Sequence, residues 1–265
     1  MTGPHYAEAV RVHVITYNRP AICARLLDDI AREMPGCKVR VFDDASTVDM
    51  TPVRQRCERP GWRFWQAWRN HGVRGYWRMV DATHRCLLED DVFQFVVQLD
   101  DDFRLCDDFW SRLIQRWNEI EDPSKIALNL LNDGRHQCWT GIVAQPLNDD
   151  VERVGWVDGG FLVPRAYFEA LDYQAPLVPQ DWWARGQRRG TGVYRYISQH
   201  LLGRGHTMYR VRQSHVVHAD GRQSVMHPKI RGQQPLQTMA YIDGEDRARA
   251  LEREAHDRTV PLPRP

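Results

Sequence analysis

The segment Val10-Arg-Val-His-Val-Ile-Thr-Tyr-Asn-Arg-Pro20 begins with valines at every second position, the period of a strand with one buried face. It then reaches Asn18, a residue type that caps helices, and Pro20, which suits the first helical turn. Apolar residues recur on one helical face from residue 22 to residue 30, and a second strand is predicted over 37–42. This strand–helix–strand order predicts an α/β fold with parallel neighbouring strands.

The same periodicities predict further elements along the chain. Helices are expected over 75–89 and 109–117, strands over 93–99 and 126–131, a strand with a glycine turn over 155–163, and a charged helix over 241–257. The stretch 51–72 is rich in Pro, Arg and Trp and has no clear period. Within it, Trp62, Trp65 and Trp68 have helical spacing, which favours one helix face packed into the core.

Length and composition bound the class of protein. The chain has 265 residues, of which 42% are hydrophobic and 27% charged, as expected of a globular protein with a substantial core. No apolar run approaches the ~18 residues of a membrane span, and no secretory signal is evident, so we expect no membrane partner and a cytoplasmic location, that of the host if the protein is viral. The six cysteines are scattered without a C-x-x-C pair, which predicts free thiols.

Charge is distributed unevenly although the net charge is only +1. Residues 151–231 carry 12 Lys/Arg and 6 Asp/Glu, whereas residues 1–150 carry 19 and 23. Only three of the 36 basic residues are lysines. Arginine-biased coding explains this composition without any function, but the forked guanidinium also suits phosphate, so a phosphate-rich partner stays open.

Two predicted strands end in carboxylates. Asp100-Asp101-Asp102 follows one apolar strand, and Asp43-Asp44 follows another. Carboxyl ends of strands are where open α/β sheets bind ligands, and neighbouring carboxylates suit Mg²⁺ or Mn²⁺ shared with substrate phosphates. A solvated turn is the alternative interpretation of the triplet. The chain has no G-x-G-x-x-G, no P-loop motif and no G-x-S-x-G, which favours metal-assisted handling of a nucleoside diphosphate without a P-loop.

Four motifs in order now carry a family resemblance. They are Ile15-Thr-Tyr-Asn-Arg-Pro20, Val41-Phe-Asp-Asp-Ala-Ser46, Asn70-His-Gly72 and Gln98-Leu-Asp-Asp-Asp102. The set resembles the nucleotide-sugar-binding half of GT-A fold glycosyltransferases, most closely the family 2 type, over roughly residues 10–220. Where that family often has Ala-Arg-Asn, this chain has Tyr76-Trp77-Arg78, so the nucleobase stays open.

The resemblance implies a fold, a division of the chain and a donor site. It implies a mostly parallel sheet flanked by helices, with a nucleotide-sugar half over 1–102, an acceptor and catalytic half over 103–232, and a charged C-terminal helix and tail over 233–265. Asp102, with Asp100 and a late histidine, His218, would hold the Mn²⁺ or Mg²⁺ ion. The remaining donor residues would contact the nucleoside diphosphate sugar, with a UDP-sugar favoured: Thr16, Asn18, Arg19, Asp43, Asp44, Asn70, Arg74, Asp100 and Asp101.

The resemblance also implies an acceptor site. Trp156-Val-Asp-Gly-Gly160 is similar to the family's glycine loop, which would place Trp156, Gly159 and Gly160 beside the acceptor. Gln180-Asp181-Trp182 is similar to its second acidic motif, which makes Asp181 the catalytic base of an inverting transfer and Asp158 the next candidate. Asp181 also reads as a helix N-cap, and both roles can hold.

The residues around the predicted base suit an acceptor that stacks and carries charge. Trp182 and Trp183 are placed to stack on a sugar or a base, and Arg188 belongs to an arginine-rich loop on the basic part of the chain. A solvated loop is the alternative interpretation. For the late metal ligand, His215 competes with His218 because of its neighbouring position.

These expectations converge on a metal-dependent, inverting hexosyl- or pentosyltransferase that moves a sugar to a hydroxyl. The segment Ser214–Pro228 resembles glycosyltransferases carried by bacteriophages, which raises a 5-hydroxymethylpyrimidine in DNA as the acceptor. A protein or glycan hydroxyl is the alternative acceptor. Other readings are a sugar-phosphate nucleotidyltransferase, whose glycine-rich loop is missing here, and a non-catalytic nucleic-acid-binding protein. The sequence leaves the oligomeric state open.

Overall fold

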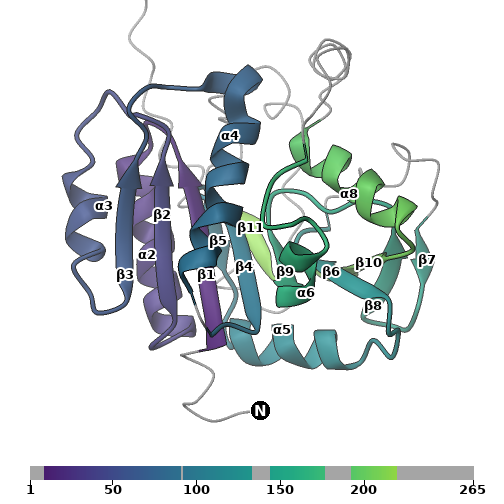
Figure 1. Ribbon diagram of the computed structural model, residues 1–265. Helices are drawn as coiled ribbons and strands as arrows, with labels where there is room; N and C mark the ends of the chain where they lie inside the picture. The colour runs from purple at the N-terminus through teal and green to yellow at the C-terminus, as the bar shows by residue number, and fades with distance from the viewer. Residues whose placement is uncertain (1–8, 91, 133–143, 177–191, 220–265) are drawn as a thin grey trace, which may run out of the picture.

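The computed structural model describes residues 9–90, 92–132, 144–176 and 192–219, whose arrangement Figure 1 shows. The predicted opening unit is present as β1 (Val10–Thr16), α2 (Pro20–Glu33) and β2 (Lys38–Asp43), with β1 and β2 parallel. Pro20 stands in the first turn of α2, as predicted. Asn18 does not cap this helix, because no side chain bonds to its first turn.

The stretch 51–72 departs from the helix predicted for its tryptophans. It forms α3 (Thr51–Arg56) and then β3 (Trp62–Gln66), which pairs in parallel with β2. Only Trp62 is buried; Trp65 is 44% exposed and Trp68 is 80% exposed. A spacing of three residues also fits a strand that buries one residue and turns its later ones outward, so the prediction of a buried helix face is wrong.

The other described elements follow the predicted order closely, whereas the helix predicted over 241–257 lies outside the described residues. The helix predicted over 75–89 is present as α4 (Gly72–Arg85) followed by the 3-10 turn η1 (Cys86–Glu89). The strand predicted over 93–99 is β4, and that predicted over 126–131 is β6. The glycine turn predicted over 155–163 leads into β9. The bounds of the remaining elements are β4 (Phe95–Asp100), β5 (Phe103–Leu105), α5 (Phe109–Asn118), β6 (Lys125–Asn129), β7 (Gln145–Pro146), β8 (Val151–Val154), β9 (Phe161–Pro164), α6 (Arg165–Glu169), α8 (Val193–Gly203), β10 (Thr207–Val211) and β11 (Val216–His218).

One nine-stranded sheet organises the molecule, in the order β3-β2-β1-β4-β9-β6-β10-β8-β7. The first four strands are mutually parallel, β9 runs against both β4 and β6, and β10 is parallel to β6. The chain winds from β1 toward β3 on one side and then crosses to β4 on the other. The boundary between β1 and β4 is therefore a topological switch point, where open α/β sheets bind ligands. The predicted α/β class, a mostly parallel sheet flanked by helices, is confirmed.

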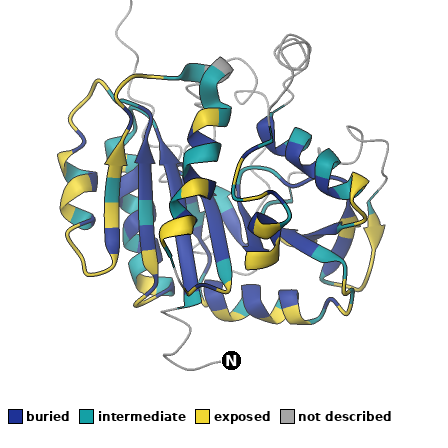
Figure 2. Cartoon of the chain, viewed as in Figure 1, coloured by how far each residue is buried: buried dark blue, intermediate teal, exposed yellow. Residues whose placement is uncertain are grey.

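Two apolar layers enclose the sheet (Figures 1 and 2). On one face, buried side chains of α2 and α5, among them Leu26 and Leu113, pack against the strands. On the other face, α4, α6 and α8 contribute side chains such as Met79, Phe168 and Leu201. A further two-stranded ribbon, β11 with β5, lies outside the large sheet. None of the described helices is long and apolar enough to cross a membrane.

Candidate functional site

The predicted donor residues gather at the carboxyl ends of β1, β2 and β4. Thr16 is the last residue of β1 and Asp100 the last of β4, and the register pairs Ile15 with Asp100. The hydroxyl of Thr16 donates a hydrogen bond of 2.7 Å to Asp101 Oδ2, which ties the two strand ends together across the switch point. We call Thr16, Asp100, Asp101 and Asp102, with the side chains that contact them, the strand-end site.

A single arginine neutralises part of the acidic triplet. Arg19, directly before α2, places its Nη1 atom 3.2 Å from Asp101 Oδ1 and 2.9 Å from Asp102 Oδ2. Both carboxylates are buried. Two buried carboxylates side by side repel each other unless a cation lies between them, so Arg19 is the chain's own counter-charge at this site.

Asp101 is nevertheless easy to protonate. Burial raises the pKa of its carboxyl to about 6, against the opposing effect of Arg19 and with a further rise from the neighbouring Asp102. A carboxyl with such a pKa changes its charge close to neutral pH.

The late histidine that reaches the site is His218. Its Nδ1 atom lies 3.1 Å from Asp102 Oδ1, and its ring lies 4.7 Å from the ring of Phe103. The position follows from the pairing of β11 with β5, which sets His218 opposite Phe103. The competing His215 is fully buried, and burial lowers the pKa of its imidazole to about 3. Of the two histidines, His218 is therefore the one that lies beside Asp102, and its role as a metal ligand stays a prediction.

The donor types at this site fit a divalent ion, but the chain does not assemble a cage for one. Asp102 shares its two oxygens between Arg19 and His218. No group of three or more His, Cys, Asp or Glu side chains is arranged to hold a metal within the residues the structure describes. Mg²⁺ commonly takes one or two carboxylates and completes its shell with water and substrate phosphates. Asp100 and Asp102 could serve in that way, and metal use stays a prediction.

The predicted glycine loop closes directly over Asp100. Gly159 has a φ of +71°, and a Cβ atom there would lie 3.2 Å from Asp100 Oδ2. A Cβ on Gly160 would lie 3.0 Å from a ring carbon of Phe103. Glycine is thus favoured at 159 by conformation, and at both positions a Cβ atom would press on the side chain next to it. Trp156, by contrast, is buried, so an acceptor would reach little of it.

Asp158 and two tyrosines extend the site beyond the predicted residues. The Asp158 carboxylate accepts a hydrogen bond of 2.9 Å from Gly159 N. Burial raises the pKa of Tyr76 well above its ordinary value, and the charges of Asp100 and Asp158 raise it further. The rings of Tyr76 and Tyr194 meet edge to face, 6.4 Å between centroids. Sequence reasoning missed both tyrosines; Tyr76 was visible only as a departure from the family pattern.

At the end of β2, the two aspartates have different surroundings. Asp43 is fully buried and accepts hydrogen bonds from Ser46 and from Gln66 Nε2, the latter at 2.7 Å. Its carboxylate is thus satisfied within the chain, which leaves little of it for a nucleobase.

Asp44 instead binds the start of α4. Its carboxylate accepts hydrogen bonds from the backbone nitrogens of His71, at 2.9 Å, and Gly72, at 3.2 Å, and from Asn70 Nδ2 at 3.1 Å. His71 Nδ1 lies 2.7 Å from the same carboxylate. A negative charge at a helix N-terminus is favourable, so Asp44 and Asn70 have a structural role here whatever they bind.

Asn18 joins the loops that follow β1 and β2. Its φ is +55°, its side chain accepts a hydrogen bond of 2.8 Å from Thr47 N, and its backbone nitrogen donates one of 2.7 Å to Ser46 Oγ. The residue thus fixes the rim of the strand-end site. Four predicted site residues lie outside the described residues: Asp181, Trp182, Trp183 and Arg188. The side chain of Arg74 also lies outside them.

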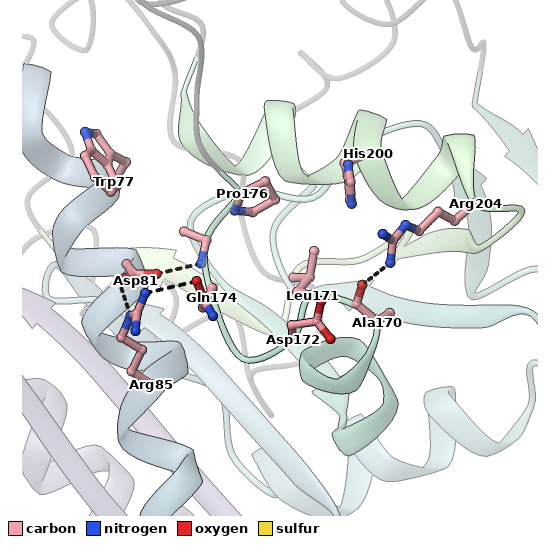
Figure 3. A pocket seen from close by; sticks show the side chains of 11 residues that line it. Trp77, Asp81, Arg85, Ala170, Leu171, Asp172, Gln174, Pro176, His200 and Arg204 are labelled. Carbon is pink, nitrogen blue, oxygen red and sulfur yellow. Dashed lines mark hydrogen bonds and ion pairs between the residues drawn. The ribbon is translucent and has the colours of Figure 1, made fainter.

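A separate cavity of about 440 Å³ lies between α4, α8 and the turn after α6 (Figure 3). None of the predicted site residues lines it. Its charged side chains are largely engaged: Arg85 Nε lies 2.6 Å from Asp81 Oδ2, and Arg204 Nη1 donates to the Ala170 carbonyl. The functional assignment therefore rests on the strand-end site.

Comparison with known proteins gives only partial likenesses. No protein-family model matches the chain, and no curated protein matches it in sequence. The A197 protein from STIV is 12% identical with a TM-score of 0.45, over 79% of this chain and 85% of that one. Glucosyl-3-phosphoglycerate synthase from Mycobacterium tuberculosis, solved with Mn²⁺, uridine diphosphate and glucosyl-3-phosphoglycerate, is 16% identical with a TM-score of 0.38. That match covers 60% of this chain and 57% of the synthase. Likenesses of this extent do not establish a shared activity.

Proposed function

We propose that the chain transfers a sugar from a nucleoside diphosphate sugar, a UDP-sugar by preference, to a hydroxyl acceptor. The observation that carries the proposal is the junction of β1 and β4, where Thr16, Arg19 and three consecutive aspartates meet at the switch point of the sheet. Ligands of open α/β sheets bind there, and carboxylates beside a cation suit a diphosphate whose charge must be balanced.

The chain's own groups divide the work at this site. Within the described residues, Arg19 is the only side-chain cation that contacts both Asp101 and Asp102. We expect its guanidinium to move from these carboxylates to the diphosphate when the donor binds. When bound, an Mn²⁺ or Mg²⁺ ion held by Asp100 and Asp102 would neutralise charge on the leaving group. His218, in contact with Asp102, would bind the ion or the diphosphate on the same side.

The proton of the acceptor hydroxyl has two candidate receivers. Asp181 is the base implied by the family resemblance. Asp158 is the runner-up, and its contact with Gly159, which lies over Asp100, supports a position beside the transferred sugar. A base on the face opposite the leaving group gives inversion, as in inverting glycoside hydrolysis.

For the acceptor, we propose a 5-hydroxymethylpyrimidine in DNA, with a protein or glycan hydroxyl as the alternative. The basic balance of residues 151–231, 12 Lys/Arg against 6 Asp/Glu, supports a phosphate-bearing acceptor. A base within a duplex would have to leave the stack to reach either carboxylate.

A thermal-shift panel of nucleoside diphosphates and their sugars, with Mn²⁺ and with chelator, tests donor binding. A ligand at ~100 times its Kd should add about 2.7 kcal/mol to the free energy of unfolding. Asp102→Asn should abolish the metal-dependent part of the shift, whereas the exposed control Asp49→Asn should keep it. A shift in Asp102→Asn equal to that of the wild type would remove Asp102 from the donor site.

Radiolabelled transfer identifies the acceptor and the base. Labelled sugar should pass to DNA that carries 5-hydroxymethylpyrimidines and not to unmodified DNA or a protein extract. Asp181→Asn should keep the nucleotide shift but lose turnover by at least ~100-fold. If Asp158→Asn loses turnover instead, the base is Asp158; if a nucleotide never shifts the wild type, the protein is not a transferase of this kind.

A further inference from the structure

The edge of the sheet formed by β3 carries a surface that the strand-end site does not use. Trp65 and Trp68 are 44% and 80% exposed, the latter an unusual value for the largest apolar side chain. Two exposed arginines, Arg63 and Arg69, neighbour them in the sequence. We define the β3 edge surface by the exposed residues Arg63, Trp65, Trp68 and Arg69.

The chain around this surface is strongly basic although the first 150 residues are acidic overall. Residues 51–71 contain five arginines and one acidic residue, Glu58. Arg56 is paired with Asp28 at 2.7 Å. Across the described part of the chain, no carboxylate forms an ion pair with the other four, whereas most arginines elsewhere do so, for example Arg11 and Arg104. Arg54 and Arg59 lie over the rings of Phe64 and Trp62, on the face of the sheet opposite Trp65, so the guanidinium groups of the β3 edge surface are those of Arg63 and Arg69.

The arginines lie against aromatic rings. Arg69 lies 4.4 Å above the ring of Trp68, and Arg54 lies 4.1 Å above the ring of Phe64. These contacts hold the guanidinium groups near the rings and leave most of Trp68 accessible. Trp65 lies 5.8 Å from the buried ring of Phe42, so its inner edge is anchored while the outer part stays exposed.

Protection of an open sheet edge explains only part of this arrangement. β3 pairs with β2 and ends the sheet, and charged residues on such edges discourage association with other strands. That need accounts for the arginines. It does not account for two exposed tryptophans, which add apolar surface to the edge and so work against this protection.

We propose that the β3 edge surface binds single-stranded nucleic acid, with Trp65 and Trp68 stacking on bases and Arg63 and Arg69 contacting phosphates. Single strands expose the π-faces of their bases, and sites that bind them combine aromatic side chains with a basic track. A duplex offers its phosphates but keeps its base faces stacked inside. The inference does not depend on sugar transfer, because the surface shares no residue with the strand-end site.

Fluorescence anisotropy of a labelled 20-nucleotide oligo(dT) with the full chain tests the proposal. Two phosphate contacts give a log–log salt slope of about −1.4 for single strands, so raising salt from about 50 to about 200 mM should weaken binding about 7-fold. Trp68→Ala should weaken it about 5- to 150-fold, the range for one stacked base, and Trp68→Phe should restore much of the affinity. Arg63→Ala with Arg69→Ala should reduce the slope by about 1.4.

Matched controls come from exposed residues elsewhere on the chain. Leu88→Ala removes another exposed apolar side chain, 65% exposed, and Arg165→Ala removes an exposed arginine; both should bind like the wild type. Trp68 is so exposed that its replacement should leave the melting temperature unchanged, which separates lost binding from lost folding.

Several results would overturn the proposal. Wild-type affinity in Trp68→Ala would do so. So would equal competition by heparin and oligo(dT) together with full binding by the tryptophan variants, because heparin has charge but no bases. Capture by anionic phosphatidylserine vesicles without oligonucleotide binding would assign the surface to a membrane instead. If Trp68→Ala lost the thermal shift given by nucleoside diphosphates but kept oligo(dT), the ring would belong to the donor site. Failure of oligo(dT) binding with an intact nucleotide shift would leave the proposed transfer standing.

Discussion

A substitution at Gly159 can separate the effect of backbone strain on stability from the effect of a displaced Asp100 on function. Gly159→Ala places a residue with a Cβ at φ +71° and brings that Cβ to 3.2 Å from Asp100 Oδ2. The left-handed conformation alone costs about 1–2 kcal/mol. The short contact must be relieved by a movement of a few tenths of an ångström, and Asp100 is the group on the other side.

The matched control is Gly205→Ala, whose φ is +85° but whose Cβ would meet nothing within 4 Å. Both variants should lose about 1–2 kcal/mol of unfolding free energy in urea titration. Only Gly159→Ala should also lose function. Since a misplacement of about 1 Å can cost ~100-fold in rate, a few tenths should cost about 3- to 10-fold in kcat/KM or in the affinity for nucleotide.

Two results of this comparison would refute the reasoning. Equal functional losses in Gly159→Ala and Gly205→Ala would mean that global destabilisation, and not the approach to Asp100, explains the effect. Full function in a correctly folded Gly159→Ala would show that the glycine loop does not position Asp100 for the donor. Activity must be measured well below the melting temperature of both variants, so that the unfolded fraction contributes nothing.

Three further predictions concern stability. Burial lowers the pKa of His84 to about 4 in the folded protein, so the unfolded chain binds more protons than the folded one below pH 6.5. The free energy of unfolding should therefore fall by about 3 kcal/mol as the pH is lowered to 4. His84→Phe should flatten this part of the pH dependence in a series of urea titrations. Asp101 acts in the opposite direction, because burial raises its folded pKa to about 6. Relative to Asp101→Asn, the wild type should lose about 2 kcal/mol of unfolding free energy between pH 4 and pH 7, and a constant difference would contradict the burial of a carboxyl there. Arg210 is buried in an ion pair with Glu152, so Arg210→Met alone should cost about 3–5 kcal/mol in chemical unfolding, whereas Arg210→Met with Glu152→Leu should recover most of it.

Periodicity predicted the α/β class because the first strands obey simple rules. The alternating valines of β1 and the apolar face of α2 were enough to predict these elements. The alternation did not predict that β1 is buried on both faces, so that Arg11 and His13 are buried as well as the valines. The ends of β1 and β4 were also predictable, because carboxylates directly after an apolar strand have few other places to lie. The contact between Thr16 and Asp101 confirms that these two strand ends adjoin.

The parts that could not be predicted depend on contacts between distant segments. Nothing local in Trp62–Gln66 states that it is the last strand of a sheet, so its tryptophans resembled a helix face. Arg19 gave no sign that it would bind two aspartates more than 80 residues away. That His218, and not His215, lies beside Asp102 follows from the register of β11 against β5, which no spacing within the sequence encodes.

The position of β9 has a consequence for how the protein can fold. This short strand, Phe161–Pro164, lies between β4 and β6 and pairs with both, so it completes the edge of the first four parallel strands with a segment made some 60 residues later. Until it arrives, the apolar strand β4 presents an unpaired edge that can join another chain. The first 102 residues, which look like a self-sufficient nucleotide-binding half, are therefore expected to aggregate when produced alone, and the sheet should form late and as one cooperative unit during synthesis.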